Sequence, residues 1–271
     1  MKRDRQAGVS LLNVLAVLAV GTGLVQVMLR DQDTALERLE RANNAVQAQA
    51  LAQGGVTSVA VALRRDFVEA PGADHLNEPW ALAVQERITL DFGQFEVSVR
   101  DVRGRFDLNA LHPSDLGAQR VFAGLLSALD LPELLAGQIV QIVSQHGPLT
   151  HPEKVLDFGI ADSDLDRLRP HITTTDAPAP LNLNSVTEPV LAALLRNPSV
   201  ARGLIARRAA KGFLEPRDFA ALGVAVPALS GFTSDAFDVD AVATVDGARA
   251  VLINRLYRDP DTGTVHDTTR P

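Results

Sequence analysis

Cysteine is absent from this chain of 271 residues, and tryptophan and tyrosine occur once each. The lack of cysteine excludes a disulfide framework, a thiolate metal site and a thiol nucleophile. Aromatic residues make up only 4% of the sequence, against 46% for all hydrophobic residues, so a folded core must consist mainly of Leu, Val and Ala. The length is sufficient for one large domain or two small ones.

Positive charge is scarce outside the first residues. The net charge is −7, whereas Lys2, Arg3 and Arg5 against Asp4 give the first eight residues a local charge of +2, so the remainder carries about −9. An acidic body is repelled by phosphate backbones, which argues against a general nucleic-acid binder. We therefore expect no nucleic acid among the partners of this chain.

Common catalytic patterns are missing as well. The sequence has no His-Glu-x-x-His, Gly-x-Ser-x-Gly or phosphate-loop motif, so we expect no enzyme activity, no catalytic residue and no cofactor. His146 and His151 lie close together, but Gly147 and Pro148 between them prevent a shared helix face, which argues against a zinc site. The histidines are His75, His112, His146, His151, His171 and His266.

Three acids with alternating spacing, Asp162, Asp164 and Asp166, resemble the start of a calcium loop. An EF-hand requires Gly at its sixth position and Glu at its twelfth, and this sequence has Arg167 and Thr173 there. The stretch is better explained as a helix N-terminus, where acids interact favourably with the helix dipole. The other acidic candidates for a metal site, among which the pattern does not choose, are Asp235, Asp238 and Asp240, and Asp259, Asp261 and Asp267.

The longest uncharged run extends from Val9 to Leu29 and contains 21 residues. As a helix it would be about 31 Å long, enough to cross the hydrocarbon core of a membrane. Basic residues precede it, so the positive-inside rule places the N-terminus in the cytoplasm and the body on the opposite side. An ordinary signal anchor is one interpretation, and a cleaved secretory signal fits less well because a charged helical pattern follows the run. A buried core helix is the third alternative, against which the length argues.

The helical pattern continues beyond this run. No proline occurs before Pro71, and Gly54 and Gly55 are the positions where a bend is expected. We therefore predict one helix from about Val9 to Val68, roughly 90 Å long, with its second half packed on a domain. The residues that step by three and four along the expected packing face are Leu36, Leu39, Ala42, Val46, Gln49, Gln53, Val56, Ala60, Leu63 and Phe67.

Strand patterns flank a long helical region. Residues 86–92 and 94–102 alternate around Gly93 as a hairpin, and residues 103–111 are expected to form a third strand that turns into a helix. Near the C-terminus, "AFDVDAVATV" and "ARAVLINRLYRD" flank Asp246-Gly247, the strongest short hairpin signal in the chain.

Between these strands, from about His112 to Val226, six segments have helical spacing. Ser163 is a candidate N-cap, and Thr187 with Glu188 is expected to open another helix before Pro189. The predicted fold class is α+β, with a long N-terminal transmembrane and amphipathic helix packed on an antiparallel sheet and a large all-α domain inserted between strands.

The N-terminal segment resembles a type IV prepilin-class signal, with a basic leader that ends in Gly8 and an uncleaved apolar helix. The resemblance implies cleavage between Gly8 and Val9 by prepilin peptidase, and glycine suits that position because no side chain lies beside the attacked carbonyl. Val9 departs from the usual Phe, Met or Leu, and Asn13 replaces the usual Glu. In the type II secretion class, the large K subunit lacks this Glu and is placed at the filament tip.

Further motifs extend the resemblance to the K-type minor pseudopilins (the GspK family) over nearly the whole chain: "DVRGRFDLNAL", "APAPLNLNSVTEPVLAALL", "ARRAAKGFLEPRDFAAL" and "FTSDAFDVDAVATV", in that order. This resemblance implies a pseudopilin fold and a non-enzymatic tip or initiation subunit of a periplasmic pseudopilus, held in the inner membrane. It also implies assembly through Leu11, Leu12 and Asn13, with I-, J- and H-type minor pseudopilins as partners. Calcium binding is known in the family, but the resemblance assigns no ligands.

The corresponding division of the chain is a leader peptide (1–8), a transmembrane helix (9–29), its periplasmic continuation (30–70), the first part of the α+β domain (71–111), the inserted helical domain (112–226), and the second part of the α+β domain with a C-terminal tail (227–271).

An alternative function comes from "PLNLNSVTEPVLAALLRNPSVARGLIARRAAKG", which resembles the helix-hairpin-helix modules of membrane-anchored competence DNA receptors. Such modules bind phosphate through backbone N–H groups of a glycine-rich turn at a helix N-terminus. The turn here, "RNPSV", has no Gly-x-Gly, and Pro198 removes one donor. The basic residues from Arg196 to Arg217 keep this alternative open.

Overall fold

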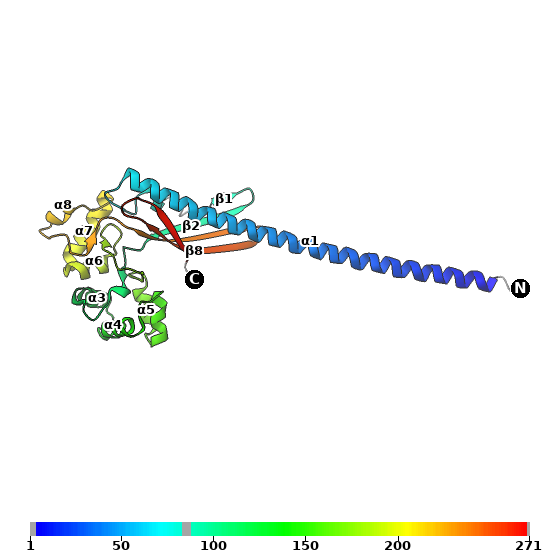
Figure 1. Ribbon diagram of the computed structural model, residues 1–271, viewed down its shortest axis with the longest axis horizontal. Coiled ribbons are helices and arrows are strands. Elements are labelled where there is room, and N and C mark those ends of the chain that lie inside the picture. The colour runs from blue at the N-terminus through cyan, green and yellow to red at the C-terminus, as the bar shows by residue number, and fades with distance from the viewer. Residues whose placement is uncertain (1–3, 83–87, 270–271) are drawn as a thin grey trace.

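This computed structural model describes the backbone of residues 4–82 and 88–269, and the side chains of residues 13–82 and 88–268. Helix α1 (Asp4–Glu69) is continuous over its whole length, including the two glycines at which the sequence suggested a bend. Its second half lies along the sheet, while its first half projects far from the body (Figure 1). The prediction of one long N-terminal helix is therefore confirmed.

The main sheet is antiparallel and has the strand order β1-β2-β7-β8-β9. Both predicted hairpins are present, because Leu90 pairs with Gly93 and Val245 pairs with Ala248 across the Asp246-Gly247 turn. The predicted tail contributes an edge strand that the sequence pattern did not indicate. The strands are β1 (Ile88–Leu90), β2 (Gly93–Asp101), β7 (Ala236–Val245), β8 (Ala248–Arg258) and β9 (Val265–Thr269).

The prediction that residues 103–111 form a third strand that turns into a helix is confirmed, but the strand is short. Only β3 (Phe106–Asp107) is extended there, and it pairs in parallel with β4 (Ile172–Thr173), outside the main sheet. The reason is that β2 already has β1 on one side and β7 on the other, so no free edge remains for a following strand. The chain leaves the sheet at a turn in which the Arg105 amide donates to the Val102 carbonyl.

Between β2 and β7 the chain is largely helical, as the sequence predicted, with two short parallel ladders in addition. Thr187 directly precedes α6 (Glu188–Leu195), as expected. Its side chain makes no capping hydrogen bond, and its hydroxyl instead contacts the His171 ring nitrogen, 2.8 Å away. Ser163 is not an N-cap, because Ala161 occupies that position. The remaining elements are α2 (Pro79–Leu82), η1 (Leu108–Ala110), α3 (Leu116–Ala128), α4 (Leu134–His146), η2 (Pro152–Phe158), α5 (Asp162–Leu168), β5 (Leu181–Asn182), α7 (Pro198–Lys211), α8 (Pro216–Ala220) and β6 (Ser230–Gly231).

Two separate hydrophobic cores divide the body. One lies between α1 and the sheet and includes the only tryptophan, Trp80, whose ring packs edge-on against Phe237. The other lies inside the helical region and is built around residues such as Phe122 and Leu165. The helical region therefore has a core of its own, and it begins and ends at neighbouring strands, because Asp101 is paired with Phe237. Figure 1 shows it at the end of the molecule away from the projecting part of α1. The α+β fold class is confirmed.

The packing face of α1 differs from the predicted one. Val56 and Leu63 are buried as expected, but Leu36, Leu39 and Val46 are more than half exposed. The contact with the sheet is made instead by small residues and their neighbours, which allow the helix to approach closely: Ala48, Ala52, Gly55, Val56, Val59 and Leu63.

Gly55 lies at the closest approach of α1 to the sheet. A Cβ atom there would lie 2.6 Å from Cγ2 of Val97, whereas a Cβ atom on Gly54 would meet nothing within 4 Å. Alanine in a helix is favoured over glycine by about 1 kcal/mol, while overpacking a core costs about 1–3 kcal/mol. We therefore expect Gly54→Ala to stabilise the protein and Gly55→Ala to destabilise it, each by about 1 kcal/mol.

Denaturation followed by the fluorescence of Trp80 measures both variants in the same assay, because Trp80 is buried beside this helix. Equal stabilisation by the two alanines would contradict the close packing at Gly55.

Candidate functional site

The residues that the sequence assigned to processing and to the start of assembly are Gly8, Val9, Leu11 and Leu12. Their side chains lie outside the described residues, so these assignments stay predictions. Asn13 is the first described side chain of α1 and is exposed. Large apolar side chains from Val14 to Leu29 are all more than half exposed. Among the described residues, α1 is the one helix that is long and apolar enough to cross a membrane.

Beyond this run, α1 remains partly apolar on its outer surface. Leu36, Leu39 and Val46 follow one another at helical spacing and have 58%, 57% and 69% of their surface exposed. Single exposed apolar residues are common, but a row of them that continues a membrane-length helix favours contact with another helix. The geometry therefore offers a surface for helix-to-helix assembly.

The C-terminal end of α1 is joined to the sheet by a buried arginine. Arg258 ends β8, and its Nη2 donates to both Asp74 carboxylate oxygens, at 2.5 and 2.6 Å. Its Nη1 lies 3.3 Å from Asp66 Oδ2, and Nη2 also donates to the Ser234 carbonyl at 2.7 Å. The arginine thus connects α1, the loop after it, and the segment that leads into β7.

This cluster contains more acid than base. Glu78 is buried beside Asp66 and Asp74, and it accepts a hydrogen bond from Trp80 Nε1 at 2.6 Å. Burial raises the pKa of Asp66 to about 7, and the negative charges of Glu78 and Asp74 add to the rise while Arg258 opposes it. Burial also raises the pKa of Glu78. The guanidinium of Arg258 therefore pairs with two of the three carboxyl groups, while Glu78 Oε1 lies 3.5 Å from His75 Nε2.

A second buried acid joins the helical domain to the sheet. Asp101, the last residue of β2, accepts hydrogen bonds from Asn182 Nδ2 at 2.7 Å, from the hydroxyl groups of Ser185 and Ser234 at 2.5 Å each, and from the Arg103 amide at 2.8 Å. Burial raises the pKa of Asp101, and these hydrogen bonds oppose the rise. A satisfied buried network of this kind holds its members rigidly.

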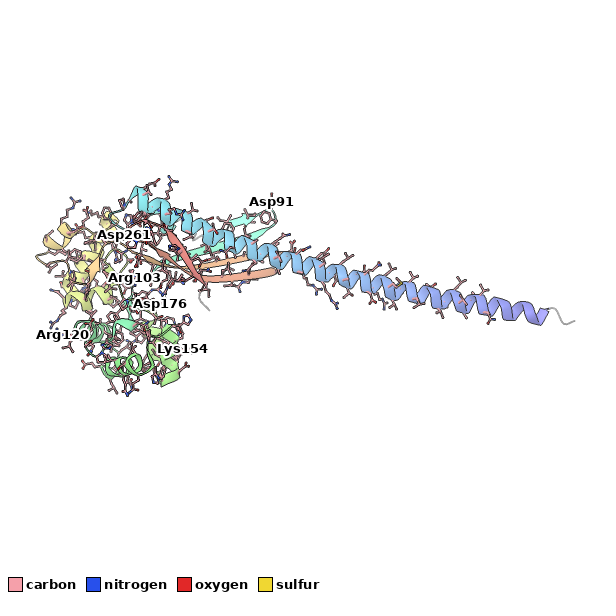
Figure 2. The ribbon with its side chains drawn as sticks, viewed as in Figure 1. Asp91, Arg103, Arg120, Lys154, Asp176 and Asp261 are labelled. Atoms are coloured by element: carbon pink, nitrogen blue, oxygen red, sulfur yellow. The ribbon has the colours of Figure 1, made fainter. Side chains whose placement is uncertain are left out.

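Two arginines complete the connection between the domains. Arg103 pairs with Asp235 at 2.5 Å and is labelled at the junction in Figure 2. Arg255 in β8 pairs with Asp238 at 2.7 Å, and its Nη1 donates to the Thr174 carbonyl of the helical domain. These contacts fix the helical domain on the end of the sheet.

Most of the acidic residues considered as metal ligands are engaged with their own chain. Asp235, Asp238 and Asp240 pair with Arg103, Arg255 and Arg100, in that order, and Asp162 and Asp166 lie near Arg169. At the C-terminus, Asp259 accepts from backbone amides and Asp267 from Asn254.

Within the described residues, the acids that do converge are Asp66, Asp74 and Glu78, which the sequence analysis did not indicate. A calcium ion does not fit this group, because the Arg258 guanidinium already lies against Asp66 and Asp74 and would repel a second cation.

The basic stretch from Arg196 to Arg217 is used mainly within the molecule. Lys211 lies 3.1 Å from Asp218, and Arg207 lies 3.7 Å from the same carboxylate. Arg208 donates to the carbonyl groups of Leu183 and Val186. The turn that the DNA-binding alternative required is a helix cap, in which Asn197 accepts from the Val200 amide. No feature of this turn favours a phosphate ligand over that cap.

Known proteins resemble this chain in sequence and in fold. Residues 181–244 match the family model described as type II secretion system (T2SS), protein K. A Type II secretion system protein K of Pseudomonas aeruginosa is 27% identical over 302 residues, which span 96% of this chain and 91% of that protein. A chain from the GspK-GspI-GspJ complex of enterotoxigenic Escherichia coli matches with a TM-score of 0.63 and 18% identity, covering 86% of this chain and 97% of the other. At this low identity, the similarity to the solved structure shows the fold alone.

Proposed function

We infer that this chain, a member of the type II secretion system protein K family, works as a minor pseudopilin that helps to start a periplasmic pseudopilus and forms its tip. The observation that carries the proposal is the placement of a separately packed helical domain between the paired strands β2 and β7, at the end of the molecule away from the projecting helix (Figure 1). The likeness to protein K along nearly the whole chain supports this assignment.

The tip position follows from shape. In a filament whose subunits pack through their N-terminal helices, the next subunit must lie above the end of the sheet. The helical domain occupies that end and is fixed there by Asp101, Arg103 and Arg255. Its bulk would obstruct a subunit stacked above, so the filament would begin with this subunit and grow beneath it.

The proposed location is the inner membrane, crossed once by the apolar part of α1, with the N-terminus in the cytoplasm and the body in the periplasm. The I-, J- and H-type minor pseudopilins are the proposed partners, and the structural neighbour from a GspK-GspI-GspJ complex supports the first two. The exposed row of Leu36, Leu39 and Val46 would serve these contacts. The role is structural, and we assign it no catalysed reaction.

Labelling of the subunit on filaments tests the proposal. We expect gold-labelled antibody against the helical domain to mark one end of each purified pseudopilus, with about one label per filament. A matched antibody against the major subunit should mark the whole length. Label for this chain that is spread along the shaft would refute the tip assignment.

A second test concerns processing. Cleavage after Gly8 should shorten the chain by about 0.9 kDa, and mass spectrometry of the protein from its native membrane should find Val9 at the N-terminus. Gly8→Val should retain the full-length mass, because a side chain at the scissile position hinders the extended backbone. Ala7→Val is the control and should still be cleaved. A wild-type N-terminus at Met1, or one beyond residue 25, would exclude the prepilin-type signal.

A further inference from the structure

A cavity of about 530 Å³ lies where the helical domain meets the sheet domain. The segment after β2, helix α3, the end of α6 and the loop before β6 surround it, and Arg103 on its wall is labelled in Figure 2. Much of its lining is aliphatic or aromatic, with Ala110, Val121, Leu181 and Leu194 only partly buried. The size is that of a small-molecule or side-chain binding pocket.

Arg105 also lines this cavity and is half-buried. Within the part of the chain that the structure describes, its guanidinium has no hydrogen bond and no ion pair. Burial lowers the pKa of Arg105, and the positive charges of Arg100 and Arg255 lower it further, while Asp238 partly opposes them. A guanidinium that has lost part of its hydration without gaining a partner is costly, so it is well placed to bind an anion.

The acids near Arg105 are already paired with other arginines. Asp238 contacts Arg255 at 2.7 Å, and Asp240 contacts Arg100 at 2.6 Å. Asp101 is a third acid whose charge acts on Arg105, but its carboxylate oxygens accept from Asn182, Ser185 and Ser234. Among the described residues, Arg105 is therefore the one of these three arginines without an ion pair.

The remaining charged groups of the lining are also engaged. Arg103 pairs with Asp235. Asp107 accepts from the Asn109 amide and from Thr175, and Asp115 accepts from the Ala118 amide at the start of α3. The nearby ring of His171 contacts Thr187, and burial and the charge of Arg105 lower its pKa. The cavity thus combines apolar walls with one available guanidinium.

We propose that this cavity binds an aliphatic carboxylate, with the carboxylate on Arg105 and the hydrocarbon part against Val121, Leu181 and Leu194. A guanidinium binds a carboxylate through two parallel hydrogen bonds, and the apolar walls exclude water from that contact. Two sources share this chemistry: the C-terminal residue of a peptide that ends in an aliphatic side chain, and a free short-chain acid. The site is separate from the helix-mediated assembly proposed above.

Binding can be measured with the full chain in lipid nanodiscs, by ligand-detected saturation-transfer NMR against empty nanodiscs. The probes are N-acetyl-Ala-Leu with a free carboxylate, the same peptide as its amide, and 4-methylpentanoate. We expect the peptide acid to bind at least about tenfold more tightly than its amide, because charge-assisted hydrogen bonds are stronger than neutral ones. Binding of 4-methylpentanoate equal to that of the peptide acid would identify the free acid as sufficient, and much weaker binding would identify the peptide C-terminus.

Arg105→Gln should reduce the affinity for the acid about tenfold or more, and Arg105→Lys should have an intermediate effect. Arg120→Gln, an exposed arginine elsewhere on α3 and not in the lining, should change nothing. The thermal midpoint of Arg105→Gln should be unchanged or higher, which an arginine needed for the fold would not allow. Val121→Phe, which keeps Arg105 and fills part of the cavity, should also reduce binding. Equal binding of acid and amide, no binding of any probe, or full affinity in Arg105→Gln would overturn the proposal.

Discussion

Arg258→Ala is expected to lower the free energy of unfolding by about 3–5 kcal/mol, the cost of removing one partner from a buried ion pair. Only 5% of the arginine is exposed, and its loss leaves Asp66 and Asp74 buried together without their ion-pair partner. Denaturation of the full chain followed by Trp80 fluorescence measures the effect. Arg249→Ala, at an exposed position of the same strand, is the matched control and should change the stability by less than about 0.5 kcal/mol.

The free energy of unfolding should also depend on pH, because the pKa of Asp66 differs between the folded and the unfolded state. The pKa of Asp66 is about 7 in the folded protein, against an ordinary value of 3.8, so the folded state binds more protons than the unfolded state between these values. Stability therefore falls as the pH rises from about 4 to 7, and the fall should be steeper without Arg258. Asp66→Asn together with Asp74→Asn should restore part of the stability of Arg258→Ala. An Arg258→Ala variant as stable as Arg249→Ala at pH 8 would refute this account of the cluster.

If the helical domain is the cap that we propose, its replacement by a short turn should let this subunit enter the filament shaft. The Val102 amide donates to the Ala236 carbonyl, so an Asn-Gly turn can join these residues directly as a hairpin. The core between α1 and the sheet contains no residue of the removed part, so the sheet domain should still fold. Asp101 loses Asn182, Ser185 and Ser234 but becomes accessible to water, which satisfies it.

Gold labelling through a peptide tag on the C-terminus distinguishes the outcomes. The complete chain with the same tag should give one terminal label per filament, and the shortened chain should give labels along the shaft together with reduced secretion. A shortened chain that folds, secretes normally and stays at the tip would show that the helical domain is not the cap. Circular dichroism establishes that the sheet has formed.

The features that were predicted correctly from the sequence are those fixed by local chemistry. The Asp246-Gly247 turn is one, because both residues adopt positive φ angles of 43° and 82° that this pair tolerates. The unbroken α1 is another, because no proline interrupts it. The order of sheet, helical domain and sheet followed from the change between period-two and helical spacing.

The features that were missed depend on contacts between distant segments. The face of α1 was misassigned because close packing of Ala48, Ala52 and Gly55 decides it, whereas larger apolar residues such as Leu36 stay outside. Strand β9 depends on a free edge of β8. The buried ion pair of Arg258 with Asp66 was not recognised because the two residues are 192 positions apart in the sequence. In addition, a charged residue in an alternating strand ordinarily faces water. These charged groups are buried only because the two domains pack together, and the sequence pattern does not show that packing.

The neighbouring position of β2 and β7 also determines the order in which the chain can fold. Arg103 and Asp235, which flank the helical domain, are 132 positions apart, so direct pairing of the strands must close a long loop. Each helix between them is held by hydrogen bonds within its own segment, and helices form faster than non-local strand pairs. We therefore expect the helical domain to collapse first and to bring the two strand ends together, so that it acts as an internal template for the sheet. The sheet is completed only when β9 pairs with the free edge of β8.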